Sequence, residues 1–94
     1  MKRDDLARLF QRMDVNPDAV CIFGVPDDEQ YVLSRRRFSF RKRYVAYYLE
    51  RGHRNRERAF STEEEACDYF AEHVLRDPTT RLVYPVFPDY EAGV

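Results

Sequence analysis

Residues 43–70 read RYVAYYLERGHRNRERAFSTEEEACDYF and contain the strongest structural signals in the chain. Residues 43–50 are rich in aromatic and other strand-forming side chains, which predicts a central strand. We expect Val45, Tyr47 and Leu49 on one face of this strand and Tyr44, Ala46 and Tyr48 on the other. Gly52 supplies the permissive residue for the turn that follows this strand. Residues 54–60 alternate arginines with other side chains, and a strand so rich in charge belongs at a sheet edge that faces water. The stretch therefore predicts two antiparallel strands followed directly by a helix.

The beginning of that helix carries a doubled capping signal. Ser61 with Glu64, and Thr62 with Glu65, both have the spacing of a capping box. The glutamates of this segment also suit the positive end of the helix dipole. We therefore predict a helix over residues 62–76. Its apolar stripe consists of Ala66, Cys67, Phe70, Ala71, Val74 and Leu75.

The N-terminal half of the chain predicts a first helix and two more strands. Residues 4–13 have apolar side chains at i, i+3, i+4 and i+7, which is the pattern of one helix face. Short apolar runs at about residues 20–24 and 31–36 predict strands, with an acidic loop between them. Residues 36–42 fit either a long hairpin loop or an extension of both neighbouring strands.

The order of these elements predicts an α+β fold in a single domain that spans residues 1–94. We expect a three- to four-stranded antiparallel meander sheet, with the N-terminal helix and the second helix packed on one face. That cover is needed because an isolated hairpin is only marginally stable in water. The predicted strands are residues 20–24, 31–36, 43–50 and 54–60. Two prolines predict an extended tail over residues 82–94.

Charge is distributed unevenly along a chain that is nearly neutral as a whole. Sixteen basic and seventeen acidic residues give a net charge of -1. Residues 34–58 contain ten basic and two acidic side chains, a local charge of +8, and the remainder carries -9. This balance argues against a protein that coats nucleic acid through overall positive charge. It leaves two surfaces of opposite sign as candidates for a partner.

Neither a secretory signal peptide nor a membrane span is predicted, because no sufficiently long apolar run is present. We therefore expect a cytoplasmic protein without membrane contact. Cys21 and Cys67 lie far apart and have no zinc-binding spacing, so free thiols are predicted and no metal site. No cofactor is expected.

The sequence offers little for catalysis, and we expect no enzymatic activity. Cys67 and His73 are six residues apart, which turns them about 120° from each other on a helix, so they do not form a nucleophile–base pair. None of the common hydrolase, nucleotide-binding or zinc-protease motifs is present. An acidic cluster on the second helix fits a capped helix with a solvated face better than a metal or acid–base site. It comprises Glu63, Glu64, Glu65, Asp68 and Glu72.

Residues 35–43 read RRRFSFRKR and allow three interpretations. Arginines could contact phosphates while Phe38 and Phe40 stack on unpaired bases. The segment could also be a solvated loop whose cations pair weakly with nearby acids. Finally, arginine and aromatic residues are favoured at protein interfaces. The candidate residues in all three cases are Arg35, Arg36, Arg37, Phe38, Phe40, Arg41, Lys42 and Arg43.

Three segments resemble a family of small, largely actinobacterial proteins. They are residues 24–33 (GVPDDEQYVL), 45–52 (VAYYLERG) and 58–70 (RAFSTEEEACDYF). The shared features are an acidic loop, a tyrosine-containing strand, an ERG turn and a helix that begins E-x-E-A-C. Members accompany secreted polymorphic toxins, and some are similar to companions of necrotizing-toxin-type NAD glycohydrolase domains. Residues 36–43 depart from the pattern, because relatives have a shorter hairpin that contains glycine.

The resemblance implies a non-catalytic immunity or antitoxin-like protein that binds a cognate toxin and occludes its active site. It would be a monomer in a heterodimer rather than a homo-oligomer. A toxin that cleaves NAD or nucleic acid would have a basic cleft, which would meet acidic side chains of this chain, whereas an acidic toxin would meet the basic segment. The alternative function is a small nucleic-acid-binding module that uses residues 35–43. The acidic candidates are Asp27, Asp28, Glu29, Asp68 and Glu72.

Overall fold

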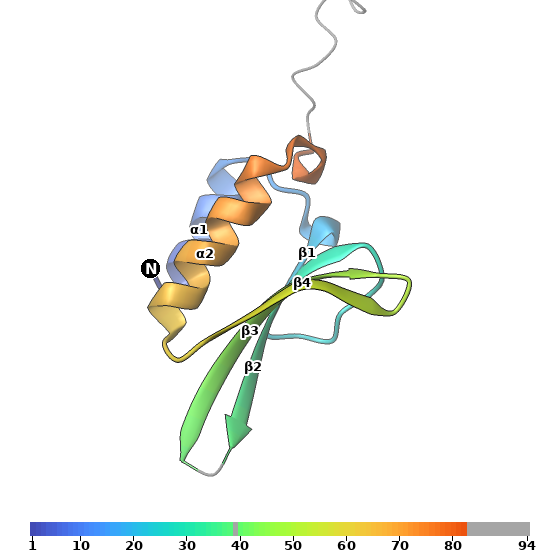
Figure 1. The fold of residues 1–94 in the computed structure, drawn as a ribbon. Helices are drawn as coiled ribbons and strands as arrows, with labels where there is room; N and C mark the ends of the chain where they lie inside the picture. Colours follow the sequence, from blue (N-terminus) through green and yellow to red (C-terminus); the bar gives the residue numbers. More distant parts are fainter. Residues whose placement is uncertain (39, 83–94) are drawn as a thin grey trace, which may run out of the picture.

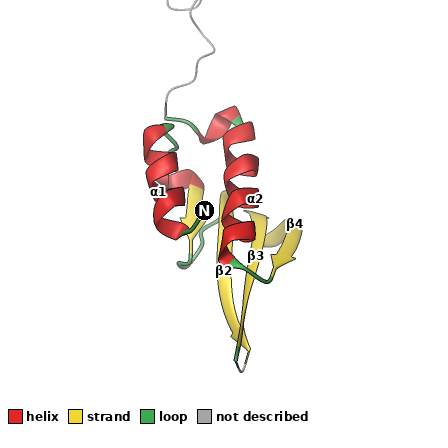
Figure 2. Ribbon diagram, turned by 90° about the vertical axis from the view of Figure 1, so that its left-hand side faces the viewer, coloured by secondary structure: helices red, strands yellow, loops and turns green. Residues whose placement is uncertain are grey.

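Two helices cover one face of a four-stranded sheet, as Figures 1 and 2 show for the computed structural model. The structure describes residues 1–38 and 40–82, so most of the predicted tail, residues 82–94, lies outside the described residues. The predicted α+β fold, with one helix before the sheet and one after it, is confirmed. The elements are α1 (Arg3–Arg12), η1 (Pro17–Ala19), β1 (Val20–Ile22), β2 (Gln30–Phe38), β3 (Arg41–Glu50), β4 (His53–Phe60), α2 (Glu63–Arg76) and η2 (Pro78–Thr80).

The sheet is mixed, with strand order β1-β2-β3-β4. β2, β3 and β4 are antiparallel neighbours as predicted, but β1 pairs with β2 in parallel, which corrects the expected meander. A parallel pair normally needs a long crossover. Here β1 is only three residues long, so residues 23–29 suffice to return the chain to the start of β2. Phe23 and Glu29 adopt positive φ angles of 59° and 61° at the two ends of this connection.

The hairpin formed by β2 and β3 is longer than predicted. Its strands were expected at residues 31–36 and 43–50, and each extends at least two residues farther toward the turn. The ambiguous segment at residues 36–42 is therefore an extension of both strands, with Arg36 paired to Arg43 in the register. In Figure 1 this end of the hairpin projects well beyond the two helices.

Side chains of β3 alternate between the two faces of the sheet, as predicted. Tyr44 and Ala46 join the core between sheet and helices, whereas Val45 and Tyr47 belong to a smaller cluster on the opposite face. Cys21 packs at the margin of that second cluster. Burying a large apolar side chain contributes about 1.5–3 kcal/mol, so the main cluster dominates stability. Its buried members are Leu6, Phe10, Val15, Leu33, Tyr44, Ala46, Ala66, Cys67, Phe70, Ala71 and Val74.

The two helices begin side by side, and side chains at the beginning of α2 cap both of them. Thr62 is the N-cap of α2, and its hydroxyl oxygen accepts a hydrogen bond from the Glu65 backbone N–H at 3.2 Å. Of the two predicted capping boxes, the one at Thr62 and Glu65 is formed in part: the Thr62 hydroxyl caps the Glu65 N–H and itself donates to the Glu65 carboxylate at 2.9 Å. The first N–H of α1, from Arg3, donates to the Glu63 carboxylate at 2.9 Å. The acidic beginning of α2 thus also holds the beginning of α1 against it.

The turn between β3 and β4 has two residues with positive φ, Arg51 at 51° and Gly52 at 79°. This is the pattern of a type I′ turn, whose twist matches that of the strands it joins. The Gly52 N–H donates to the Asp28 carboxylate at 3.0 Å. This hydrogen bond joins the β1–β2 connection to the β3–β4 turn.

Candidate functional site

The projecting end of the β2–β3 hairpin, residues 35–43, carries six cations and is called the basic arm below. Its residues alternate between the two faces of the strand pair. Arg35 continues the face of Leu33, and its guanidinium lies 4.8 Å from the centre of the Phe23 ring on the helix side. The cations on the helix side are Arg35, Arg37 and Lys42, and those on the opposite side are Arg36, Arg41 and Arg43.

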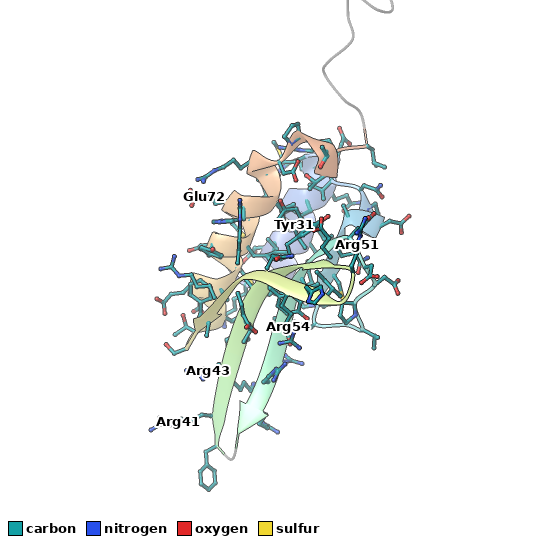
Figure 3. All side chains as sticks on the ribbon, turned by 45° about the vertical axis from the view of Figure 1, so that its right-hand side comes forward. Tyr31, Arg41, Arg43, Arg51, Arg54 and Glu72 are labelled. Carbon is teal, nitrogen blue, oxygen red and sulfur yellow. The ribbon has the colours of Figure 1, made fainter. Side chains whose placement is uncertain are left out.

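The cations of the basic arm face one another rather than acidic groups. Arg36 is directly opposite Arg43, and Arg37 is directly opposite Lys42. Like charges in such positions destabilise a strand pair. Within residues 1–38 and 40–82, none of the ion pairs involves an arm cation. The arm therefore presents positive charge that the described part of the chain does not neutralise, and Arg41 and Arg43 extend from it in Figure 3.

An aromatic side chain stands at the tip of the basic arm. Phe40 lies in the turn between β2 and β3 and is fully exposed, at 101%. Ser39 and the side chain of Phe38 lie outside the described residues, so the predicted pair of stacking rings is placed for Phe40 alone. A fully exposed phenylalanine between arginines has the composition of an interface anchor.

The predicted acidic candidates lie on separate elements, and most of them are already engaged. Asp28, in the β1–β2 connection with Asp27 and Glu29, accepts the Gly52 N–H described above. On α2, Asp68 binds the Met1 α-amino group at 2.8 Å. Glu72 on the same helix forms an ion pair with Arg76. These carboxylates lie on separate elements, whereas the basic candidates share the projecting end of one hairpin.

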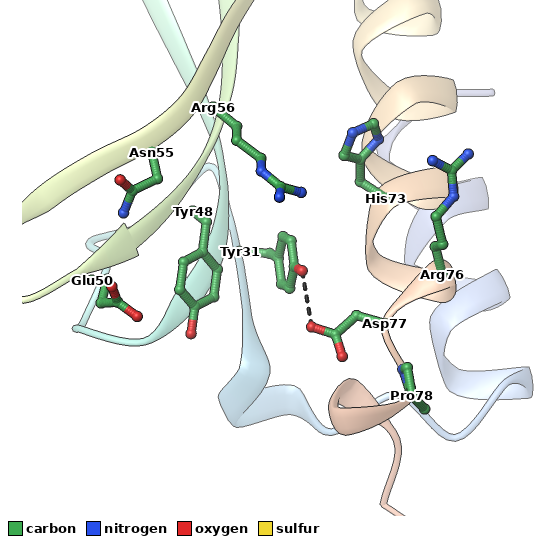
Figure 4. Close-up of a pocket in the computed structure, with 9 residues that line it drawn as sticks. All are labelled: Tyr31, Tyr48, Glu50, Asn55, Arg56, His73, Arg76, Asp77 and Pro78. Atoms are coloured by element: carbon green, nitrogen blue, oxygen red, sulfur yellow. Dashed lines mark hydrogen bonds between the residues drawn. The ribbon is translucent and has the colours of Figure 1, made fainter.

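A groove of about 790 Å³ between α2 and the sheet was not predicted from the sequence. Figure 4 shows it between the C-terminal half of α2, the start of β2 and the β3–β4 strand pair. The Tyr31 hydroxyl donates to the Asp77 carboxylate at 2.9 Å across it. The pKa of Tyr31 is raised to about 12, mainly by burial and secondly by this hydrogen bond. Burial opposes ionisation of Asp77, but hydrogen bonds from Thr79 and Tyr31 hold its pKa below the usual value.

The arginines of β4 do not share one face, which corrects the simple alternation that the sequence suggests. The pairing with β3 shifts between Ala46 and Tyr48, so β4 contains a bulge. Arg54 lies over the Tyr47 ring at 4.6 Å on the face away from the helices. Arg58 lies over the ring of Tyr69, a residue of α2, at 5.1 Å. Arg56, within the bulge, lines the groove.

The thiols and histidines are not arranged for nucleophilic catalysis. Cys67 is buried on the core-facing side of α2, and this burial raises its pKa to about 11, so the thiolate is disfavoured. Cys21 packs on the opposite face of the sheet, and both cysteines are free. The His73 ring stacks on Tyr69 with centroids 4.1 Å apart.

Further comparisons add no assignment to these surfaces. Comparisons with protein families, with curated proteins and with solved structures gave no match. Residues 1–38 and 40–82 contain no group of three His, Cys, Asp or Glu side chains arranged to hold a metal ion. In the same part of the chain, no helix has the length and apolar character needed to cross a membrane. Of the candidate sites, the basic arm therefore has the most charged side chains without an ion pair among the described residues.

Proposed function

We propose that the chain is a non-catalytic immunity protein that neutralises a cognate bacterial toxin by inserting the basic arm into the toxin's active-site cleft. The observation that carries this proposal is positive charge on both faces of a projecting hairpin, without an ion pair within residues 1–38 and 40–82. The resemblance of residues 24–33, 45–52 and 58–70 to toxin companions supports the same function. The protein acts in the cytoplasm, as one subunit of a heterodimer.

The distribution of cations on the arm favours a cleft over a flat binding surface. A flat partner meets one face of a strand pair, and the cations of the other face then remain in solvent. Arg36 and Arg43 on one face, and Arg37 and Lys42 on the other, are neutralised together only when acidic walls lie on both sides. Relief of the like-charge repulsion within each pair adds to the binding free energy.

The tip of the arm provides the apolar part of the same contact. Phe40 is fully exposed in the free protein and is the first side chain to enter a cleft. Burying a phenylalanine side chain contributes about 1.5–3 kcal/mol. Aromatic and arginine side chains together dominate the binding energy of most protein interfaces. Phe40 thus anchors the arm, while the arginines guide and orient it.

A protein partner fits the rest of the molecule better than a nucleic acid. Outside residues 34–58 the chain carries a net charge of -9, and a polyphosphate that extends past the arm meets this charge. Proteins that bind single strands also display several aromatic rings on an exposed sheet face. On the face of this sheet that points away from the helices, Tyr47 is only 6% exposed.

The proposal is tested by co-expressing the chain with the toxin candidate encoded beside it. We expect the wild-type chain to protect the cells and to co-purify with the toxin. The double variant Arg36→Glu/Arg43→Glu reverses one charge pair of the arm and should lose both properties. The matched control Arg8→Glu/Arg12→Glu makes the same charge change on α1 and should keep them. Equal protection by the arm variant, or no complex with wild type, would contradict the proposal.

Binding of nucleic acid, the alternative function, is tested by a separate experiment. Fluorescence anisotropy with labelled RNA and DNA oligonucleotides measures the affinity of the wild-type chain at several salt concentrations. Phosphate contacts produce an affinity that falls steeply as salt rises. Tight, salt-sensitive binding that the arm variant loses would favour the nucleic-acid module over the immunity protein.

A further inference from the structure

Arg56 occupies a backbone conformation that arginine adopts rarely. Between the pairs Ala46–Arg58 and Tyr48–Asn55, β4 has two residues where β3 has one. Arg56 is the first of these two and has a φ of 56°, in the left-handed region that favours glycine. Bulges of this kind redirect a side chain, and such strain commonly marks a functional position.

The bulge sends Arg56 into the groove between the sheet and α2. In Figure 4 its guanidinium extends from β4 toward the helix, close to Tyr31 and His73. The neighbouring Arg54 forms an ion pair with Glu57 at 3.1 Å, and Arg58 lies over aromatic rings. The Arg56 side chain has neither a hydrogen bond nor an ion pair with the part of the chain that the structure describes. It is exposed, so its donors face solvent in the groove and are open to a ligand.

A second unused polar atom lies on the opposite wall. His73 comes from α2 and lines both the groove and a smaller cavity that Arg56 and Tyr31 also line. Its Nδ1 is buried and has no hydrogen-bond partner among the described residues. A buried polar atom without a partner is unfavourable and is usually explained by a ligand or a functional role. Arg56 from β4 and His73 from α2 therefore line the same groove, with the Arg56 guanidinium exposed in it and the His73 Nδ1 buried behind the wall.

The carboxylates that line the groove do not accept hydrogen bonds from the side chains of Arg56 and His73. Asp77 uses one carboxylate oxygen for the Thr79 N–H and hydroxyl and the other for the Tyr31 hydroxyl. Glu50 lies beyond Tyr48, at the other end of the groove (Figure 4). Because these acceptors are engaged or remote, an incoming oxyanion is the natural partner of Arg56 and His73.

We propose that Arg56 and His73 form an oxyanion-binding site, whose preferred ligand is a carboxylate carried on a planar aromatic body. The planar guanidinium of arginine matches a carboxylate with two parallel hydrogen bonds. Tyr31 and Tyr48, with ring centroids 4.8 Å apart, provide an aromatic wall beside this position. The groove volume of about 790 Å³ is typical of sites for small molecules. The site lies apart from the basic arm and does not depend on the arm's function.

The proposal is tested by NMR titration of the full chain with benzoate, acetate and inorganic phosphate. Benzoate should cause saturable shifts of the Arg56 Nε–Hε signal and of the His73 ring signals. Acetate lacks the aromatic body and should bind more weakly. Phosphate tests the other source of an oxyanion, and tighter binding of phosphate than of benzoate would overturn the carboxylate assignment. No saturable shift with any of the three probes would overturn the site itself.

Matched variants separate a binding role of Arg56 from a structural one. Arg56→Gln removes the charge and should weaken benzoate binding about tenfold or more, as expected for a lost charge-assisted hydrogen bond. Arg54→Gln alters the neighbouring arginine on the other face and should bind benzoate like wild type. Arg56→Gly should also lose binding, yet its thermal unfolding midpoint should rise because the strain is removed. Unchanged affinity in Arg56→Gln, or a lower midpoint in Arg56→Gly, would contradict the inference.

Discussion

The β2–β3 hairpin has an inner and an outer half that share one ladder of backbone hydrogen bonds and differ in their side-chain contacts. In the inner half, Val32 and Leu33 are buried on opposite faces of the sheet, at 1% and 0% exposure. In the outer half, the basic arm, Arg36 faces Arg43 without an acidic neighbour among the described residues. The inner half therefore stabilises the fold, and the outer half is held in place by that stability while it displays charge. The same hairpin therefore stabilises the fold with its inner half and displays positive charge with its outer half.

The largest effect is expected from a cavity in the inner half. Leu33→Ala removes a fully buried side chain between the sheet and the helices and should lower the free energy of unfolding by about 2–5 kcal/mol. Urea unfolding followed by circular dichroism measures this loss. Val25→Ala, at a position that is 93% exposed, is the control and should leave the transition unchanged. A similar small effect at both positions would show that the inner half is not the foundation of the fold.

A smaller effect is expected from the hydrogen bond between the inner half and the end of α2. Tyr31→Phe removes the donor to Asp77 and should lower the free energy of unfolding at neutral pH by about 1 kcal/mol. The pKa of Tyr31 is raised from 10.0 to about 12, so its protonated phenol contributes stability that is fully present below pH 10. This contribution is lost as the pH rises through about 12, and the variant should lack that loss.

Urea unfolding at a series of alkaline pH values compares the two proteins. The Tyr48 hydroxyl has no hydrogen-bond partner within residues 1–38 and 40–82, so Tyr48→Phe is the matched control at neutral pH. Parallel alkaline profiles for wild type and Tyr31→Phe would show that the Tyr31 hydroxyl does not couple to folding.

The outer half should respond in the opposite direction. Arg43→Glu places an acidic group opposite Arg36 and should raise the free energy of unfolding by about 0.2–1 kcal/mol. Hydrogen exchange of the arm amides should slow at the same time, because the strand pair opens less often. The same substitution should weaken toxin binding, so stability and binding change with opposite signs. A destabilised arm in this variant would contradict the idea that its cations repel one another.

The smallest effect on folding is expected at the tip. Phe40→Ala changes a fully exposed side chain, so the midpoint of urea unfolding should stay at the wild-type value. Affinity for the toxin, measured by calorimetry, should fall because the anchor is lost. A shifted unfolding midpoint would show that Phe40 packs against the fold and is not free for a partner.

The contrast between the two halves also explains how far the sequence could predict the structure. The alternation along β3 correctly assigned Tyr44 and Val45 to opposite faces, because a strand with one covered face has a strict period of two. The cap at Thr62 was predictable from its spacing to Glu65. Local patterns were therefore sufficient for the fold class, the second helix and the location of the basic segment.

Other features depend on contacts between distant segments, which local patterns do not encode. The parallel direction of β1 depends on how residues 23–29 return along the sheet, and no residue type in this connection reports it. The bulge places Arg56 and Arg54 on different faces although simple alternation assigns them to one. The groove combines Tyr31, Arg56 and His73 from β2, β4 and α2, so its members become neighbours only in the folded chain.

Both edges of the sheet are poor templates for another strand. β1 presents only three residues, and β4 is interrupted by the bulge at Arg56 and flanked by exposed arginines. A straight row of unpaired backbone groups is what permits edge-to-edge aggregation, and neither edge offers one. The same bulge that aims Arg56 into the groove therefore also protects the chain from polymerising at high concentration.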